Sequence, residues 1–258
     1  MSGDVPHGET LLGASDLRVT VPDMHLLSVN TGPPRRVDYT DAPSGTTGIG
    51  KHPVHTPVRV TAPGAPGVGA SGVGASGVGD DAVCDLRYHG GDDRAVYAFA
   101  REDLDAWERD LGCTLPHGAF GENLTTAGID LREVLVGERW RIGDEVVLEA
   151  TGGRIPCRTF AGWVAEQGWA PEKGWLRRFT LSGSPGVMFR VLTPGTLRAG
   201  DEVRVLHRPA HPVTVASLFR AVTTERKRLP EVLAAAEWME REQREIAEKY
   251  TAKYGTAT

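Results

Sequence analysis

The sequence predicts a mostly β (α+β) protein, in which a barrel-like β-domain with peripheral helices is followed by a small C-terminal helical module. Short runs of β-branched and apolar residues between Gly-Asp turns predict the strands. One turn-and-strand pattern, residues 141–148, is repeated at residues 198–206, as expected for a barrel-like sheet. After His211-Pro212 the apolar residues take a helical spacing, which predicts the module.

Composition and charge narrow the class of protein. The 258 residues are 40% hydrophobic and 24% charged, which is ordinary for a globular chain. A net charge of −5 argues against a general nucleic-acid binder. No apolar run approaches the roughly 18 residues of a membrane span, and no secretory signal is visible. We therefore expect a cytoplasmic protein with no nucleic-acid or membrane partner.

The cysteines support a reducing compartment. There are 3 of them, Cys84, Cys113 and Cys157, and no two form a CxxC pair. This spacing predicts neither a disulfide framework nor a zinc ribbon. Free thiols in the cytoplasm are the expected state.

The first part of the chain contains few predicted elements. Residues 1–23 lack periodic apolar residues, and we expect a flexible leader there. Met24–Val29 is the first predicted strand, and the alternation in Val58–Val60 predicts a second one. We place the β-domain at residues 24–207 and the helical module at residues 208–258.

A glycine-rich repeat interrupts the β-domain. Gly67–Ser71 recurs as Gly72–Ser76 and begins again at Gly77. Valine is the only sizeable side chain in each unit, so packing offsets little of the ordering entropy. We interpret residues 64–79 as a flexible insertion in a surface loop.

The central elements follow in order. Ala95–Phe99 leads into a helix whose apolar face is marked by helical spacing, with Gly112 as its C-cap. The residues at that spacing are Leu104, Trp107 and Leu111. In residues 141–148 and 198–206, Gly-Asp supplies the turn and β-branched residues supply the strand.

Two helices are predicted in the C-terminal module. Val213–Val222 is a short one, and Pro230 opens a longer one because proline suits the first helical turn. One apolar stripe runs along the longer helix. Its members are Val232, Ala236, Met239, Ile246 and Tyr250.

The first of three polar clusters in predicted loops is His89-Gly90-Gly91, followed by Arg94. Paired glycines let backbone amides approach a ligand, and His89 and Arg94 can donate hydrogen bonds to an anion. A tight turn between a strand and a helix explains the glycine pair equally well.

The second cluster is Gly121-Glu122-Asn123. It offers an acceptor and a mixed donor–acceptor beside a permissive glycine. Taken alone, this cluster is better explained as an Asx-type turn than as a ligand site.

The third cluster surrounds Cys157. Pro156 fixes the backbone before the thiol, and Arg154 and Arg158 flank it with positive charge. Cations favour the thiolate, which attacks electrophiles and binds soft metals. Most free cysteines are inert core residues, and we interpret Cys84 and Cys113 in that way. A hydrolase with His89 as base is an alternative, although the order of residues indicates no triad.

In this order the clusters resemble the MOSC family, named for the C-terminal domain of molybdenum cofactor sulfurases. The residues that carry the resemblance are Gly50–Val54, Gly79-Asp80, His89-Gly90-Gly91, Gly121–Leu124, Arg154–Cys157 and Ser184-Pro185-Gly186. The chain is most similar to the YiiM-type bacterial group, and its end from His211 resembles the three-helix module of that group. The glycine-rich repeat is a departure, because it lengthens the loop before Gly79-Asp80.

The resemblance implies a barrel-like fold and a pterin-based molybdenum cofactor, molybdopterin. Cys157 matches the family cysteine and is expected to be both the catalytic residue and the metal ligand. The residues expected to bind the cofactor are Lys51, His89, Gly90, Gly91, Arg94, Gly121, Glu122, Asn123 and Arg154.

The resemblance also implies an activity. We expect an oxidoreductase that reduces small N-hydroxylated compounds such as hydroxylaminopurines or amidoximes. Its electrons are expected from a separate reductase, because the sequence has no flavin, NAD or iron–sulfur motif. The alternative is a non-catalytic cofactor carrier or sulfur-transfer protein that uses Cys157. A third hypothesis assigns the C-terminal helices to docking of the reductase.

Overall fold

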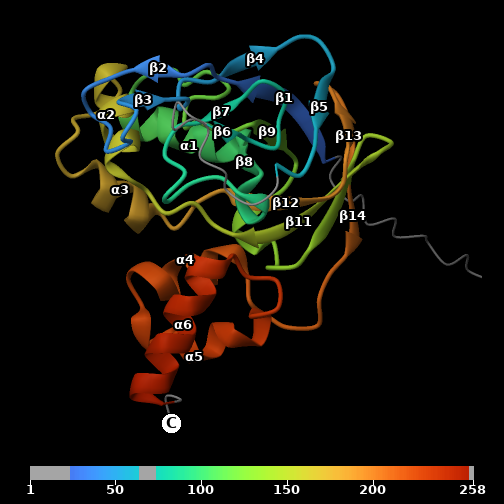
Figure 1. Ribbon diagram of the computed structural model, residues 1–258, viewed down its shortest axis with the longest axis vertical. Helices are drawn as coiled ribbons and strands as arrows, with labels where there is room; N and C mark the ends of the chain where they lie inside the picture. The colour runs from blue at the N-terminus through green and yellow to red at the C-terminus, as the bar shows by residue number, and fades with distance from the viewer. Residues whose placement is uncertain (1–23, 64–73, 256–258) are drawn as a thin grey trace, which may run out of the picture.

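The computed structural model describes residues 24–63 and 74–255, and its centre is an eight-stranded curled sheet (Figure 1). Neighbouring strands are antiparallel except for one parallel pair, β8 and β9. In spatial order the strands are β14 (Val203–His207), β10 (Arg139–Ile142), β11 (Val146–Gly152), β12 (Val187–Thr193), β8 (Val96–Ala100), β9 (Leu124–Ala127), β1 (His25–Thr31) and β4 (His52–Val54).

Three separate two-stranded sheets accompany this sheet. They are β2 (Arg35–Arg36) with β3 (Thr46–Thr47), β5 (Val58–Val60) with β13 (Gly195–Leu197), and β6 (Gly74–Ala75) with β7 (Ala82–Val83). The mixed α+β class and the barrel-like sheet predicted from the sequence are confirmed.

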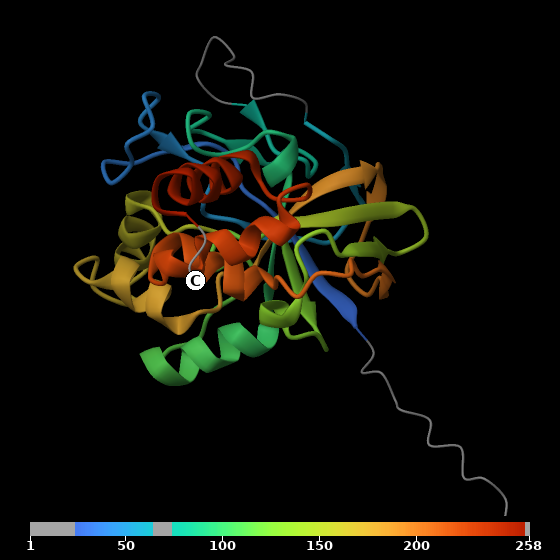
Figure 2. The same ribbon diagram turned by 90° about the horizontal axis from the view of Figure 1, so that it is seen from below.

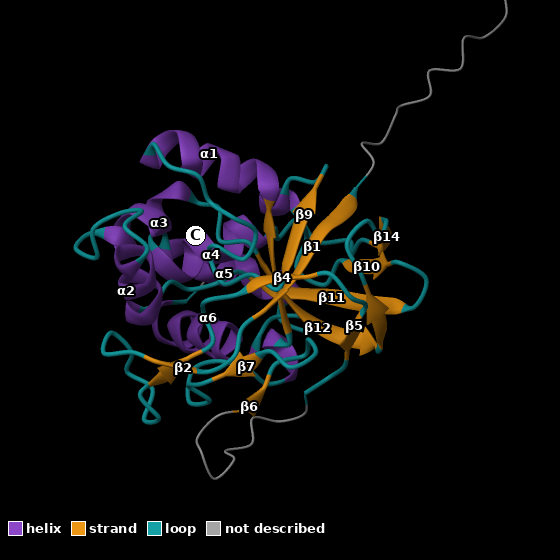
Figure 3. Ribbon diagram, turned by 90° about the horizontal axis from the view of Figure 1, so that it is seen from above, coloured by secondary structure: helices purple, strands orange, loops and turns teal. Residues whose placement is uncertain are grey.

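The helices form two groups. Figure 3 shows α1 (Arg101–Leu111), α2 (Arg158–Glu166) and α3 (Trp175–Ser182) on the side away from the splayed strands. The second group is α4 (Val215–Thr223), α5 (Leu229–Val232) and α6 (Arg241–Tyr254), which lies across one end of the β-domain (Figure 2). The 3-10 turns are η1 (Asp92–Arg94), η2 (Leu131–Glu133), η3 (Arg226–Arg228) and η4 (Leu233–Ala235). Within the described ranges, every helix is too short or too polar to cross a bilayer.

Several predicted elements occur where the sequence placed them. Strands β1 and β5 match the first two predictions, and α1 ends at Gly112, whose φ of 70° closes the helix. The Gly-Asp turns precede β11 and β14, and both strands belong to the central sheet. The predicted short helix begins two residues later, at Val215, because the Thr214 side chain caps it by accepting from the Ser217 amide.

Two hydrophobic cores stabilise the fold. The first joins the sheet to the C-terminal helices, and includes Trp140 and Leu148 together with Leu218 and Ala247. The second lies among α1, α2 and α3 and is largely aromatic. Its fully buried rings are Phe99, Phe120, Phe160, Trp175 and Phe179. The β-domain and helical module therefore share buried surface, while their predicted boundary stays a prediction.

The single long helix predicted from Pro230 is wrong. The chain forms the short helix α5, continues through η4, and starts again as α6 at Arg241. The break lies at Glu240, whose carboxylate accepts from the amides of Glu242 and Gln243 and so caps a new helix. Val232 and Met239 before the break belong to the first hydrophobic core, and Ile246 and Tyr250 after it pack against that core.

The glycine-rich segment is described only in part. The leader 1–23 and residues 64–73 of the predicted insertion lie outside the described residues. The end of the segment differs from a flexible surface loop, because Val78 is fully buried and forms a bridge with Val60. Ser76 is buried as well.

Candidate functional site

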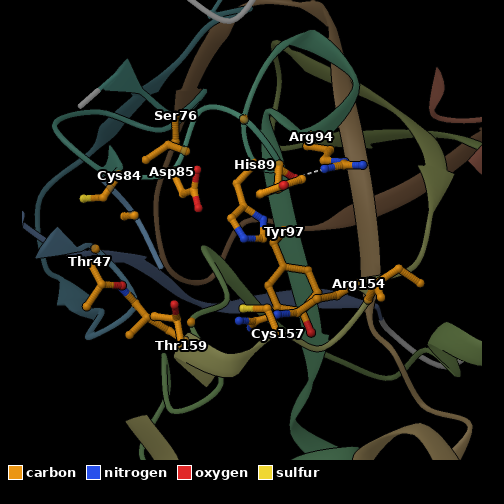
Figure 4. Close-up of a pocket in the computed structure, with 18 of the residues that line it drawn as sticks. Thr47, Ser76, Cys84, Asp85, His89, Arg94, Tyr97, Arg154, Cys157 and Thr159 are labelled. Atoms are coloured by element: carbon orange, nitrogen blue, oxygen red, sulfur yellow. Dashed lines mark hydrogen bonds between the residues drawn. The ribbon is translucent and has the colours of Figure 1, made fainter. Parts of the chain in front are cut away.

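A cavity of about 430 Å³ lies between the loops of the β-domain and the C-terminal helices (Figure 4). It contains most of the residues that the sequence singled out. Those lining it are Lys51, His89, Gly90, Arg94, Gly121, Asn123, Arg154 and Cys157. Gly91 and Glu122 do not line it.

Cys157 lies at the junction between β11 and α2. The chain leaves β11 at Gly152, and Cys157 is the N-cap of α2, with its carbonyl accepting from the amides of Phe160 and Ala161. The side chain is partly buried. Figure 4 shows its sulfur and the His89 ring pointing toward one another.

The surroundings of Cys157 favour the thiolate. Burial raises the pKa of this thiol, but a hydrogen bond from His89 and the positive charge of Arg154 outweigh it and lower the pKa to about 6. The cavity therefore contains a thiolate near neutral pH. The flanking Arg158 pairs with Asp41 at 2.9 Å.

Arg154 is held by aromatic rings. Its guanidinium lies 4.3 Å from the centre of Phe160 and 5.3 Å from that of Tyr97, and it donates to the Phe120 carbonyl. No carboxylate of the described residues forms an ion pair with it. The charge of Arg154 is therefore available to an anionic group in the cavity.

The His89-Gly90-Gly91 segment is both a turn and part of the cavity wall. The His89 amide donates to the Asp85 carbonyl at 2.9 Å, which closes the turn. Gly90 and Gly91 have φ of 78° and 80°, a left-handed conformation that favours glycine. The two interpretations of this glycine pair are compatible, since the turn places Gly90 against the cavity.

A buried ion pair between Lys51 and Asp81 forms another wall. Asp81 also accepts from the Gly32 amide and from the Asn123 side-chain amide, both at 2.9 Å. Asn123 is therefore already engaged by a neighbour. Asp81 has no local sequence signal, because its partners lie on segments far away in the chain.

Glu122 has a different place from the one predicted. It is fully buried, and its carboxylate accepts from the amides of Gly118 and Phe120 and from the Thr125 hydroxyl. Burial raises the pKa of this carboxyl, while the same hydrogen bonds act in the opposite direction. Glu122 thus organises the loop behind the cavity wall.

Arg94 also has strong partners within the protein. It pairs with Glu240 at 3.0 Å and Glu242 at 2.7 Å, and it donates to the Tyr88 carbonyl. The sequence predicted a donor to an anionic ligand. The structure shows a connection between the His89 loop and α6.

The side chains around Cys157 determine whether the protein alone could hold a metal ion there. The described residues contain no group of three or more His, Cys, Asp or Glu side chains arranged to hold a metal ion. A complete ligand shell for a metal at Cys157 would therefore need ligands from outside these side chains, as with a metal carried by an organic cofactor. A cavity of about 430 Å³ is within the usual size range of ligand sites. Thiolate, cation and cavity therefore fit such a group.

The sequence matches a known protein family. The MOSC domain model matches residues 85–204. The chain is 30% identical over 190 residues to the uncharacterized protein YflK of Bacillus subtilis, covering 74% of this chain and 76% of that one. It is 33% identical over 131 residues to protein YiiM of Escherichia coli, covering 50% and 55%.

Other similarities concern a fungal protein and solved structures. A Gibberella moniliformis protein named "Reductase" is 31% identical over 140 residues, which cover 52% of this chain and 23% of that protein. The crystal structure of YiiM from Geobacillus stearothermophilus superposes with a TM-score of 0.66 at 24% identity, covering 88% and 98%. The crystal structure of YiiM from Escherichia coli superposes with a TM-score of 0.62 at 19% sequence identity, covering 91% of this chain and 96% of that one.

The curled sheet and the thiol-containing cavity define a MOSC-type domain with a helical extension. The chain belongs to the MOSC domain family. It is similar to YiiM of Escherichia coli in sequence and to the solved YiiM structures in fold.

Proposed function

We propose that this protein binds a pterin-based molybdenum cofactor in the cavity and reduces N-hydroxylated compounds, with Cys157 as the metal ligand. The observation that carries the proposal is the Cys157 thiol, whose pKa of about 6 makes it a soft anionic ligand inside a ligand-sized cavity. Membership of the MOSC family and the relative named "Reductase" support it.

The cavity residues have separate tasks in this proposal. Cys157 would hold the metal, and Arg154 would bind an anionic group of the cofactor. His89 keeps the thiol ionised by its hydrogen bond. Lys51, which is paired with Asp81, would contact the cofactor from its place in the cavity wall.

The overall reaction converts R–NHOH, two electrons and two protons into R–NH2 and water. When bound, the cofactor would supply the two-electron oxygen-acceptor chemistry that cleavage of the N–O bond requires. A separate reductase would deliver the electrons. The protein would orient the substrate and exclude bulk water.

Metal analysis tests the ligand role. We expect purified wild type to contain molybdenum and Cys157→Ser to lose at least about 90% of it, because serine is a harder and far less acidic ligand. Cys113→Ser is the matched control, since Cys113 is also partly exposed but does not line the cavity. Equal molybdenum in wild type and Cys157→Ser would refute the ligand role.

A measurement of substrate turnover distinguishes the proposed reductase from a non-catalytic cofactor carrier. Metal-loaded protein is supplied with an amidoxime or a hydroxylaminopurine and with an artificial reductant. We expect formation of the corresponding amidine or aminopurine. Bound molybdenum without product would contradict the enzyme and favour the carrier or sulfur-transfer alternative.

A further inference from the structure

The C-terminal helical module contributes one wall of the cavity. Val222 at the end of α4 lines it, as do Glu242, Gln243 and Ile246 of α6. Ile246 follows Gln243 by three positions and Glu242 by four, so its side chain lies on the same face of the helix as theirs. Cys157 and His89 line the same cavity from the β-domain. The cavity is complete only when the module is in place.

The N-terminal turn of α6 is bonded to the loop that contains His89. Arg94 reaches from η1 to Glu240 and Glu242, at 3.0 and 2.7 Å. The Arg241 amide donates to the Asp93 carboxylate at 3.3 Å. These contacts fix the start of α6 relative to the loop.

The same turn is bonded to the segment that leads to Cys157. The Glu240 amide donates to the Thr151 carbonyl at 2.9 Å. The Gln243 side-chain amide donates to the Gly153 carbonyl at 3.2 Å, and Gln243 itself is buried. The first turn of α6 therefore bridges the two loops that carry His89 and Cys157, and it sets their spacing.

Ile246 differs in chemistry from the polar residues of this wall. It is partly buried against the first hydrophobic core and also lines the cavity. An isoleucine offers only van der Waals contact, so its effect on a ligand depends on size and shape. Glu242 and Gln243 are engaged with Arg94 and Gly153, and they position the wall that Ile246 presents.

We propose that α6 is the size-selecting wall of this cavity and that Ile246 is its specificity-determining residue. The role of Ile246 in selecting a substrate rests on the proposed function. The wall itself does not, because it limits access of any reagent to Cys157.

Alkylation of Cys157 in the cofactor-free protein tests the wall directly. The reagents are iodoacetamide, which is small, and N-phenylmaleimide, which is bulky. The modified Cys157 peptide is followed by mass spectrometry, because Cys84 also lines the cavity. Each rate is divided by the wild-type rate with the same reagent, so that differences in intrinsic reactivity cancel.

We expect Ile246→Trp to slow N-phenylmaleimide by about tenfold, the discrimination a hydrophobic pocket gives for a small change in size, and to slow iodoacetamide far less. Ile246→Ala should act in the opposite direction and accelerate the bulky reagent. Glu248→Trp is the matched control, because Glu248 is an exposed α6 residue that does not line the cavity.

The outcomes separate this inference from the proposed function. The size-selecting role of α6 would be refuted if the Ile246 variants changed the alkylation rates of both reagents equally. It would also be refuted if neither variant changed either rate. Ile246→Ala carries the test if the tryptophan variant does not fold. A second arm measures kcat/KM for a small and a bulky amidoxime. A shift in reagent selectivity without turnover in wild type would support the wall and contradict the proposed activity.

Discussion

Two polar regions lie on opposite sides of the loop that contains Gly121, and they differ in how their polar atoms are used. Behind the loop, Glu122 accepts three hydrogen bonds, and Asn30 bonds Thr125 and the Glu122 carbonyl. In front, the described residues provide no carboxylate for Arg154, and the Cys157 thiolate faces a cavity. The polar groups of the first region find their partners within the protein, whereas the charged groups of the second can still bind a ligand.

This difference distinguishes residues that stabilise the fold from residues that can bind a ligand better than residue type does. Glu122 and Cys157 both come from glycine-containing loops. The internal partners of Glu122 show that its carboxyl group serves the fold, because buried polar groups are costly when they lack partners. Each prediction below challenges this comparison at one position.

The largest expected effect is at Glu122. Glu122→Ala would leave the buried amides of Gly118 and Phe120 and the Thr125 hydroxyl without their acceptor. Each such loss costs about 1–3 kcal/mol, so we expect the free energy of unfolding to fall by about 3 kcal/mol or more. Urea denaturation followed by circular dichroism measures it.

Glu122→Gln is the conservative control for this prediction. It preserves the shape and one acceptor oxygen, so its loss of stability should be smaller than that of alanine. If Glu122→Ala instead left stability unchanged and reduced cofactor content, Glu122 would belong to the binding region, and the comparison would fail.

The second prediction concerns the reactivity of Cys157. The alkylation rate of cofactor-free protein should rise through pH 6 and level off near pH 7, because the thiol deprotonates with a pKa of about 6. At pH 6 about half of it is thiolate, against about 0.3% for an ordinary cysteine of pKa near 8.5. Since the nucleophilicity of a thiolate falls with its pKa, we expect Cys157 at pH 6 to be alkylated about tenfold faster than an ordinary cysteine.

The reference for this advantage is Cys157 in the same protein unfolded by urea. His89→Gln should move the midpoint of the rate profile to higher pH, because the hydrogen bond from His89 is the largest influence that lowers this pKa. Identical profiles for folded and unfolded protein would show that the cavity does not activate the thiol.

The sequence predicted those parts of the molecule that depend on local patterns. The alternation in Val58–Val60, the helical spacing ending at Gly112, and the Gly-Asp turns before β11 and β14 all correspond to observed elements. The break at Glu240 was missed, because a glutamate cap cannot be distinguished from a surface glutamate without its tertiary partners.

The site was predicted in part for the same reason. Cys157, Arg154 and His89 have local contexts of glycine, proline and charge that mark them. The cavity is also lined by Asp81, Tyr97 and Ile246, which are brought to it by the packing of segments that are distant in the sequence. No local signal for them exists, since a lone apolar or acidic residue looks the same anywhere on a helix or strand.

Arg94 gives the smallest expected effect, and it tests the boundary between the two kinds of region. Its side chain is 16% exposed and pairs with Glu240, which is 8% exposed, and with Glu242, which is 57% exposed. Arg94→Gln should lower the free energy of unfolding by about 1–2 kcal/mol, less than for a fully buried pair because water screens one partner and Glu240 keeps its amide donors.

The matched control for Arg94 is Arg204→Gln, which removes an exposed pair with Glu202 and should leave stability at the wild-type value. A connecting role for Arg94 predicts that only its variant is less stable and exchanges amide hydrogens faster at the start of α6. A ligand-binding role predicts equal stability for the two variants, with cofactor content reduced for Arg94→Gln alone. The two measurements together assign Arg94 to the scaffold or to the site, because the ion pairs with α6 contribute to stability whether or not a ligand is bound.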